Sequence, residues 1–195
     1  MISLLAIALA AAPPVARDPV NRWDPYVIEA SRRFAIPADW IKRVIRLESG
    51  GATILHGLPI RSPAGAMGLM QVLPGTWTEI RQRYSLGPDP DDPRDNILAG
   101  TAYLRLMYEQ FGYPLLFAAY NAGPGRVTAC QQGRGLLPRE TRLYLSSISG
   151  SQIHSLEARQ HLFIPVGNAP VSHRVSQDPL FADRHEPAEA TIATE

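Results

Sequence analysis

The sequence predicts a mostly α-helical protein with one compact domain and little or no β-sheet. Apolar residues recur at spacings of three and four in several segments, and no segment alternates convincingly between apolar and polar residues. Prolines and glycines stand between these segments, where helices typically begin and end. The chain has 195 residues, of which 45% are hydrophobic, so it is long enough to bury one sizeable core.

Residues 1–20 are typical of an export signal followed by a linker. The run from Met1 to Ala12 carries no charged side chain. It is shorter than the roughly 20 apolar residues of a transmembrane helix, and small residues at 8–12 offer a cleavage site. No Lys or Arg precedes the run, so a misplaced start codon or a frayed end stays open as the alternative. We predict export to the periplasm or cell envelope.

Three helices are predicted in the first half of the domain, which we expect to span residues 21–164. The first begins at Asp24, its N-cap, and the second follows Pro37 and ends at Gly50. The third covers residues 74–84, after a glycine-rich stretch of small and apolar residues that we expect to be an irregular loop.

Four further helices are predicted in the second half. Asp95 caps a long helix that ends at Gly112. Residues 114–120 are apolar on all sides, which is typical of a helix buried at the domain centre. Two shorter helices are expected over residues 126–131 and 139–148. Residues 165–195 are polar and rich in proline, which predicts a disordered tail.

Composition and charge exclude several classes of function. The 19 basic and 18 acidic side chains nearly cancel, whereas nucleic-acid-binding proteins carry a clustered basic excess. Cys130 is the only cysteine, so neither an internal disulfide nor a multi-cysteine metal site can form. The histidines make no metalloprotease-type pair, and neither a phosphate-binding loop nor a serine-hydrolase signature occurs. We expect no metal, no cofactor and no nucleic-acid partner.

Glu48 is the main candidate for a catalytic group. It lies four residues after Val44 and three after Ile45, so a helix places it on the same face as these aliphatic side chains. A carboxyl group that continues an apolar face is partly desolvated, which favours its protonated form. A protonated carboxyl is what a general acid needs to break a glycosidic bond. A glutamate in the last turn of a helix is more often a solvated surface residue. The neighbouring motifs are therefore needed to choose between a catalytic and a surface role for Glu48.

These motifs resemble the catalytic domain of the soluble-type lytic transglycosylases. They are Glu48-Ser49, then Ser62 followed by Gly68-Leu69-Met70-Gln71, then Ala119-Tyr120-Asn121-Ala122-Gly123, and more loosely Glu140-Thr141-Arg142-Leu143-Tyr144. They occur in the order of the family, and the resemblance covers residues 36–144. The resemblance implies a lysozyme-like helical domain with a glycan-binding cleft.

The resemblance also implies a role for each residue. Glu48 would protonate the oxygen between N-acetylmuramic acid and N-acetylglucosamine. As a carboxylate it would then accept the proton of the muramic acid's own 6-hydroxyl, which closes onto C1 and leaves a 1,6-anhydro sugar. The substrate's N-acetyl oxygen would replace the second carboxylate of most glycosidases. The residues expected to bind the glycan are Ser62, Met70, Gln71, Tyr120, Asn121 and Tyr144.

Some assignments stay open at this point. Met70 and Tyr120 could instead be core residues, the latter with its hydroxyl bonded internally, and a contact of Glu140 with the stem peptide is more speculative. Leu73 stands where the family often has methionine. The 13 residues between Glu48 and Ser62 exceed the usual connection, which predicts an added loop beside the cleft.

Two other functions compete with this interpretation. A hydrolytic muramidase, resembling goose-type lysozyme, would use water in place of the 6-hydroxyl. A non-catalytic wall-binding component of an envelope-spanning machine would only hold the glycan, and an intact Glu48 argues against it. The expected partners are peptidoglycan glycan strands and, by analogy with small family members, a conjugation or type IV secretion apparatus. We expect a monomer.

Overall fold

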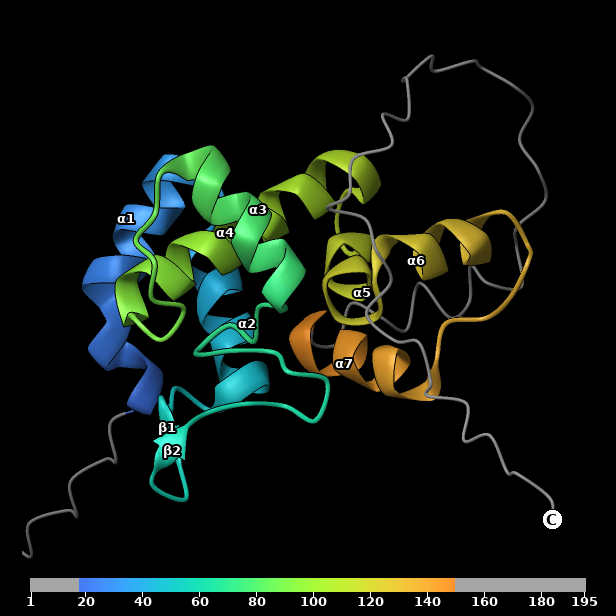
Figure 1. Cartoon of the computed structure of the whole chain (residues 1–195). Coiled ribbons are helices and arrows are strands. Elements are labelled where there is room, and N and C mark those ends of the chain that lie inside the picture. Colours follow the sequence, from blue (N-terminus) through green and yellow to red (C-terminus); the bar gives the residue numbers. More distant parts are fainter. Residues whose placement is uncertain (1–17, 150–195) are drawn as a thin grey trace, which may run out of the picture.

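Seven α-helices and one 3-10 helix make up most of residues 18–149, the part of the chain that the computed structural model describes. They are η1 (Pro19–Trp23), α1 (Asp24–Phe34), α2 (Ala38–Ser49), α3 (Pro74–Tyr84), α4 (Pro93–Phe111), α5 (Leu115–Ala122), α6 (Pro124–Gln131) and α7 (Arg139–Ser149). Two short strands, β1 (Ile54–Leu55) and β2 (Leu58–Pro59), form a hairpin. The predicted mostly α-helical fold with little sheet is confirmed (Figure 1). Residues 1–17 and 150–195, which hold most of the predicted signal and the whole predicted tail, lie outside the described residues.

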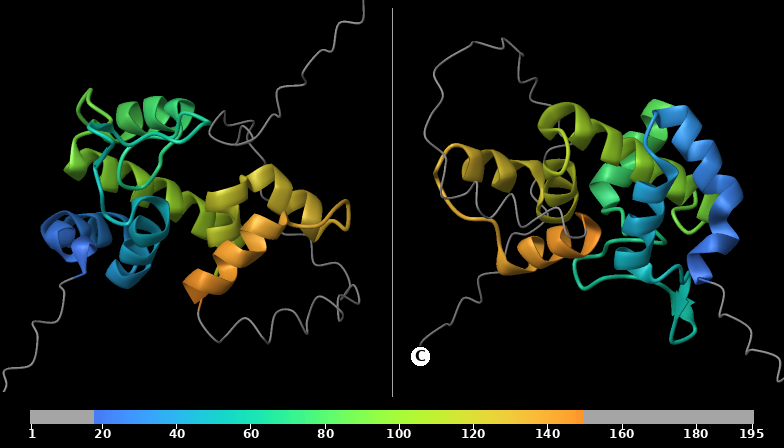
Figure 2. Two further views of the ribbon diagram at one scale, coloured as in Figure 1. Left: turned by 90° about the horizontal axis from the view of Figure 1, so that it is seen from below. Right: turned by 180° about the vertical axis from the view of Figure 1, so that it is seen from behind.

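Helix α4 forms the centre of the domain and packs against α1, α3 and α5 (Figure 2). Every residue from Asp95 to Leu104 is buried, and so are Leu116 to Tyr120 of α5. The apolar run at 114–120 therefore forms most of a buried helix that packs against α4 at the domain centre, as its composition predicted. Each fully buried aliphatic side chain stabilises the fold by roughly 1.5–3 kcal/mol. The contact between α4 and α5 is therefore a major source of stability, and the other helices pack around it.

Helix α2 has the amphipathic pattern that the sequence predicted. Ile41, Val44 and Ile45 have no exposed surface. The helix ends where Gly50 adopts a left-handed conformation with φ 62° and donates to the Arg46 carbonyl, the common glycine cap of a helix. Glu48 therefore lies in the last turn of α2, above the buried face.

The N-terminal boundary of the domain differs from the prediction. Residues 19–23, expected to belong largely to a linker, form η1, and Val20 within it has no exposed surface. Asp18 accepts a hydrogen bond from the Val20 backbone N–H and pairs with Arg46. Both interactions favour the charged carboxylate, and they lower the pKa of Asp18 below its ordinary value. The ordered domain thus begins before Asn21.

Two predicted helix caps were also wrong. Helix α1 has Trp23 at its N-cap position without a side-chain hydrogen bond, so Asp24 is the first helical residue. The N-cap of α4 is Asp92, which accepts from the Asp95 N–H at 2.9 Å. The Asp95 carboxylate instead accepts from the Gly87 N–H at 2.6 Å. Several aspartates precede α4, and spacing alone does not tell which of them caps it.

The added loop between Glu48 and Ser62 folds as the β1–β2 hairpin. Ile54 pairs with Pro59, and Leu55 pairs with Leu58. His56 and Gly57 form the two-residue turn with φ 52° and 80°, as type I′ turns of hairpins require. The hairpin is too short to show the alternation by which strands are predicted, so the sequence predicted its place but not its structure.

None of the helices within residues 18–149 combines the length and the apolar character needed to cross a membrane.

Candidate active site

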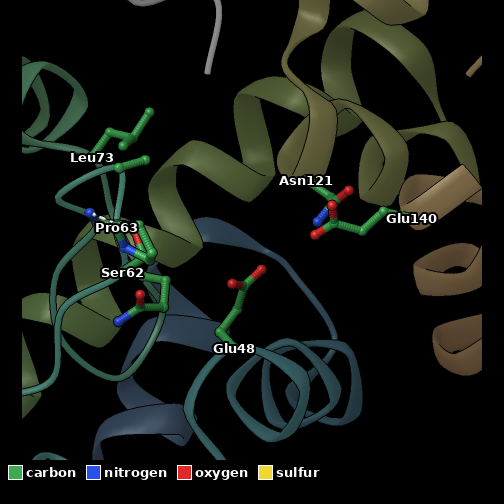
Figure 3. Close-up of a pocket in the computed structure, with 9 residues that line it drawn as sticks. Glu48, Ser62, Pro63, Leu73, Asn121 and Glu140 are labelled. Atoms are coloured by element: carbon green, nitrogen blue, oxygen red, sulfur yellow. Dashed lines mark hydrogen bonds between the residues drawn. The ribbon is translucent and has the colours of Figure 1, made fainter. Parts of the chain in front are cut away.

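A cavity of about 270 Å³ lies between four segments that are far apart in the sequence. They are the end of α2, the loop between the hairpin and α3, the end of α5 and the beginning of α7. Its lining residues are Glu48, Ser62, Pro63, Ala64, Ala66, Gln71, Leu73, Asn121 and Glu140. Figure 3 shows Glu48 pointing into the space between the Ser62–Pro63 side and the Asn121–Glu140 side. The volume approaches the lower end of the range for small-molecule sites, about 300 Å³.

Glu48 is half-buried, and its position is fixed from another helix. The Tyr144 hydroxyl of α7 donates a hydrogen bond of 3.0 Å to Glu48 Oε1. The next residue, Ser49, donates to the Leu69 carbonyl at 2.8 Å and to the Ile45 carbonyl at 3.1 Å. These contacts hold the last turn of α2 against both α7 and the loop that carries Gln71. A carboxyl held in this way meets the positional requirement for a general acid or base.

Ser62 begins a tight turn on the opposite wall of the cavity. Its hydroxyl oxygen accepts from the Ala66 N–H at 3.0 Å, and its backbone N–H donates to the Ala66 carbonyl at 3.1 Å. The Gly65 N–H donates to the Ser62 carbonyl at 2.9 Å. A serine hydroxyl is both donor and acceptor. The Ser62 oxygen accepts from Ala66, so its O–H proton can still be donated to a ligand.

Gln71 lies at the end of a loop in which both backbone groups of the preceding residue, Met70, are hydrogen-bonded. The Met70 N–H donates to Asn96 Oδ1 at 2.8 Å, and its carbonyl accepts from the Tyr120 hydroxyl at 2.7 Å. Gln71 itself has φ 48°, and its Nε2 donates to the Gly68 carbonyl at 2.9 Å. A non-glycine residue in the left-handed region persists only where the surroundings hold it. The loop therefore presents Gln71 to the cavity in one conformation.

Asn96 is the buried residue on which this loop rests. It is 1% exposed, and its Nδ2 donates to the Met67 and Pro90 carbonyls at 3.0 and 2.9 Å. Gly68 packs directly on it, because a Cβ at Gly68 would lie 2.4 Å from the Asn96 Nδ2. Asn96 was not predicted as a site residue. The available signal was an amide directly before the apolar residues Ile97 and Leu98.

Asn121 and Glu140 line the wall opposite Ser62. The buried Thr141 hydroxyl of α7 donates to Asn121 Oδ1 at 2.9 Å. This bond sets the orientation of the Asn121 amide, with its NH₂ group on the side away from Thr141. Thr141 was part of a recognised motif, but no role was predicted for it. Glu140 is exposed and is the second carboxylate of the cavity.

The structure places the predicted site residues in three groups. Glu48, Ser62, Gln71 and Asn121 line the cavity, and Tyr144 contacts Glu48. Met70 and Tyr120 do not line it, because their side chains have no exposed surface. The hydroxyl of Tyr120 is bonded internally, to Met70, which is the core alternative left open for it. Within residues 18–149 no group of three or more His, Cys, Asp or Glu side chains is arranged to hold a metal ion.

Comparison with known proteins gives a consistent set of relatives. A model of the Transglycosylase SLT domain matches residues 25–140. The soluble lytic murein transglycosylase of Escherichia coli (strain K12) is 42% identical over 99 residues, which are 47% of this chain and 15% of that protein. The protein of the same name from Salmonella typhimurium is 49% identical over 75 residues, 35% of this chain and 12% of that protein. The chain therefore spans a small part of these curated relatives.

Solved structures show the same likeness. An inactive mutant of lytic transglycosylase Slt from Pseudomonas aeruginosa superposes with a TM-score of 0.56 at 29% identity, over 74% of this chain and 25% of that chain. The 70 kDa soluble lytic transglycosylase of Escherichia coli gives a TM-score of 0.56 at 30% identity, over 72% of this chain and 24% of that chain. A complex of the 70 kDa enzyme with bulgecin A gives a TM-score of 0.54 at 29% identity, over 77% of this chain and 25% of that chain.

Proposed function

Because the chain belongs to the Transglycosylase SLT domain family, we propose that it is a lytic transglycosylase that cleaves the glycan strands of peptidoglycan. The bond cleaved is the β-1,4 linkage between N-acetylmuramic acid and N-acetylglucosamine. The observation that carries the proposal is the position of Glu48, half-buried in the last turn of α2 and pointing into the cavity where the family's other motifs meet.

The reaction needs one carboxyl group that acts twice. Glu48 in its protonated form donates its proton to the glycosidic oxygen, and N-acetylglucosamine leaves with a free 4-hydroxyl. The substrate's N-acetyl oxygen stabilises the cationic C1. The Glu48 carboxylate then accepts the proton of the 6-hydroxyl as that oxygen bonds to C1. Glu48 is protonated again at the end, no water is consumed, and the product ends in 1,6-anhydromuramic acid.

We propose supporting roles for the remaining site residues. Ser62, Gln71 and Asn121 present hydroxyl and amide groups at the cavity wall, which suit the hydroxyl and N-acetyl groups of an amino sugar. Tyr144 orients Glu48. Met70 and Tyr120 act from the interior, because the bond between the Tyr120 hydroxyl and the Met70 carbonyl holds the Gln71 loop to α5.

The experiment that tests this proposal is mass analysis of digested peptidoglycan with wild type and two variants of the same cavity. Glu48→Gln keeps the side-chain volume but can neither donate nor accept the proton, so turnover should fall by at least about 10⁴ while glycan binding survives. Glu140→Gln is the matched control, and it should keep most of the activity and the same anhydro products. Near wild-type digestion by a folded Glu48→Gln protein would show that another residue is the acid.

The same analysis distinguishes the hydrolytic alternative. A muramidase that used Glu140 to activate water would release products ending in reducing muramic acid, and Glu140→Gln would abolish them. Reducing muramic acid as the main wild-type product would therefore replace the transglycosylase proposal with the hydrolytic one.

We further propose that the protein acts in the periplasm as a monomer, exported by the apolar run of residues 1–12. Its action on peptidoglycan would then serve an envelope-spanning apparatus of the conjugation or type IV secretion kind. Fusion of residues 1–21 to a reporter that is active only in the periplasm should give a signal in the native host. A silent fusion would contradict export by this segment.

A further inference from the structure

The β1–β2 hairpin exposes a cluster of apolar side chains. Ile54, Leu55 and Leu58 are 53%, 52% and 69% exposed, and all six residues 54–59 are exposed. No Asp, Glu, Lys or Arg occurs between Glu48 and Arg61. Figures 1 and 2 show the hairpin projecting beyond the helices of the domain. Transfer of such apolar side chains from water to an apolar environment lowers their free energy.

The two faces of the hairpin indicate which environment suits it. Successive residues of a strand point to opposite faces, so the pair Ile54–Pro59 lies on one face and the pair Leu55–Leu58 on the other. A hairpin that packs on a flat protein surface needs only one apolar face, with polar residues on the other. Apolar pairs on both faces favour a medium that surrounds the tip, as the interfacial region of a lipid bilayer does.

Two side chains of η1, Arg22 and Trp23, contact the base of the hairpin and suit the headgroup region. The Gly51 carbonyl accepts from the Arg22 guanidinium and from the Trp23 indole N–H, and Arg22 lies over the Trp23 ring at 4.8 Å. Within residues 18–149 no carboxylate forms an ion pair with Arg22. Tryptophan is enriched at membrane–water interfaces, and arginine is attracted to anionic lipid headgroups.

The base of the hairpin, at Gly51, lies against the first residues of η1. Gly51 packs against Pro19 and Val20, since a Cβ on Gly51 would lie 3.2 Å from the Val20 nitrogen. The chain therefore enters the domain beside the hairpin, a few residues after the apolar run of residues 1–12. The base of the hairpin and the first described residues of the chain thus lie side by side.

We propose that the hairpin tip inserts Ile54, Leu55 and Leu58 into the interfacial region of a lipid bilayer, with Arg22 and Trp23 at the level of the headgroups. This contact holds the domain at a membrane surface. It does not depend on the reaction at Glu48, because none of the five residues lines the cavity.

A fluorescent label at the tip tests the insertion directly. The full-length chain with Cys130→Ser and Leu58→Cys is labelled with an environment-sensitive dye and mixed with vesicles of phosphatidylethanolamine and phosphatidylglycerol. The emission should shift to the blue and be quenched by nitroxide-labelled lipids. Leu136→Cys, at a side chain 84% exposed, is the matched control and should show neither change. An unchanged spectrum at position 58, or equal changes at both positions, would overturn the proposal.

A second pair of variants measures the contribution of the leucines. Leu55→Ser with Leu58→Ser should lower the partition of the full-length chain onto these vesicles at least about tenfold. Ile28→Ser with Leu136→Ser removes two aliphatic side chains elsewhere, 45% and 84% exposed, and should leave partition unchanged. Because all four positions are exposed, both proteins should melt like wild type. Equal vesicle binding by the two double variants contradicts the proposal. In the labelling experiment, a blue shift that grows with protein concentration in the absence of vesicles also contradicts it, because it would show that the tip contacts a second copy of the chain.

Discussion

At the scale of single residues, the contact between Tyr144 and Glu48 links α2 with α7, the last described helix. The two residues are 96 positions apart, and the hydrogen bond between them is 3.0 Å long. Tyr144 touches the proposed acid and base, so it controls where the Glu48 carboxyl lies relative to the glycosidic oxygen. Misplacement of a reacting group by about 1 Å can lower a rate about 10²-fold.

Tyr144→Phe should therefore lower kcat more than it raises KM. The ring and its packing remain, and only the hydroxyl that donates to Glu48 is lost. A hydrogen bond to the Glu48 carboxylate, the form that acts in the second step, is worth about 1.5–3 kcal/mol, which corresponds to a loss of about 10- to 100-fold in kcat. Steady-state kinetics on peptidoglycan would measure it. Tyr113→Phe, at an exposed tyrosine outside the cavity, is the control, and equal kinetics for the two variants would deny Tyr144 its orienting role.

The residues of the site were predictable to different degrees. Glu48 follows from its place after Val44 and Ile45 and from the motifs around it. Asn96 and Thr141 do not, because their effect depends on partners 26 and 20 positions away in the sequence, at Met70 and Asn121. Whether Tyr120 faced the cavity or the core was equally undecidable, since an aromatic residue with a polar tip suits either place.

At the scale of elements, α4 supports the loop that carries Gln71. Asn96 of this helix bonds to three backbone groups, at Met67, Met70 and Pro90. Asn96→Ala should lower the free energy of unfolding by about 3 kcal/mol or more, because a buried polar group left without its partner costs about 1–3 kcal/mol. Activity should fall as well, since the Gln71 loop loses its support. Chemical denaturation and digestion assays measure the two effects.

Gln110→Ala is the control for this change. Gln110 is exposed on the same helix, so its replacement should shift the denaturation midpoint little. If Asn96→Ala were as stable and active as this control, the packing of Met70 and Leu69 and the bonds from Tyr120 and Ser49 would suffice to hold the loop.

The helices were predicted well where apolar residues recur at a regular spacing along the sequence. Helices α2, α3 and α5 lie within a residue or two of the predicted spans. Apolar residues recur along one face of α2 and α3, and α5 is apolar on all sides. Pro19–Trp23 and the β1–β2 hairpin are too short to show a period. Their structures depend instead on contacts such as those of Arg22 and Trp23 with Gly51.

At the scale of the whole molecule, the described residues contain both the core and the cavity. The buried apolar residues run from Val20 to Ile148, and the cavity lining runs from Glu48 to Glu140. Removal of residues 165–195 should therefore leave the melting temperature and the wall-degrading activity nearly unchanged. Calorimetry and a peptidoglycan digestion assay would measure this. A clear fall in either would mean that these residues complete the domain or its cleft.

The backbone bond from the Ile60 N–H to the Thr53 carbonyl, 3.0 Å long, closes the hairpin at its base. Residues 54–59 lie on the far side of that bond. Ser62 and Gln71 are held by their own contacts, so we expect a change in residues 54–59 to leave them in place. Since doubling the length of a loop costs only about 0.6 kcal/mol in closure entropy, residues 54–59 form a natural insertion point. Evolution or protein engineering can exchange this segment for a longer one, even a separate binding module, and retarget the domain without rebuilding its cavity.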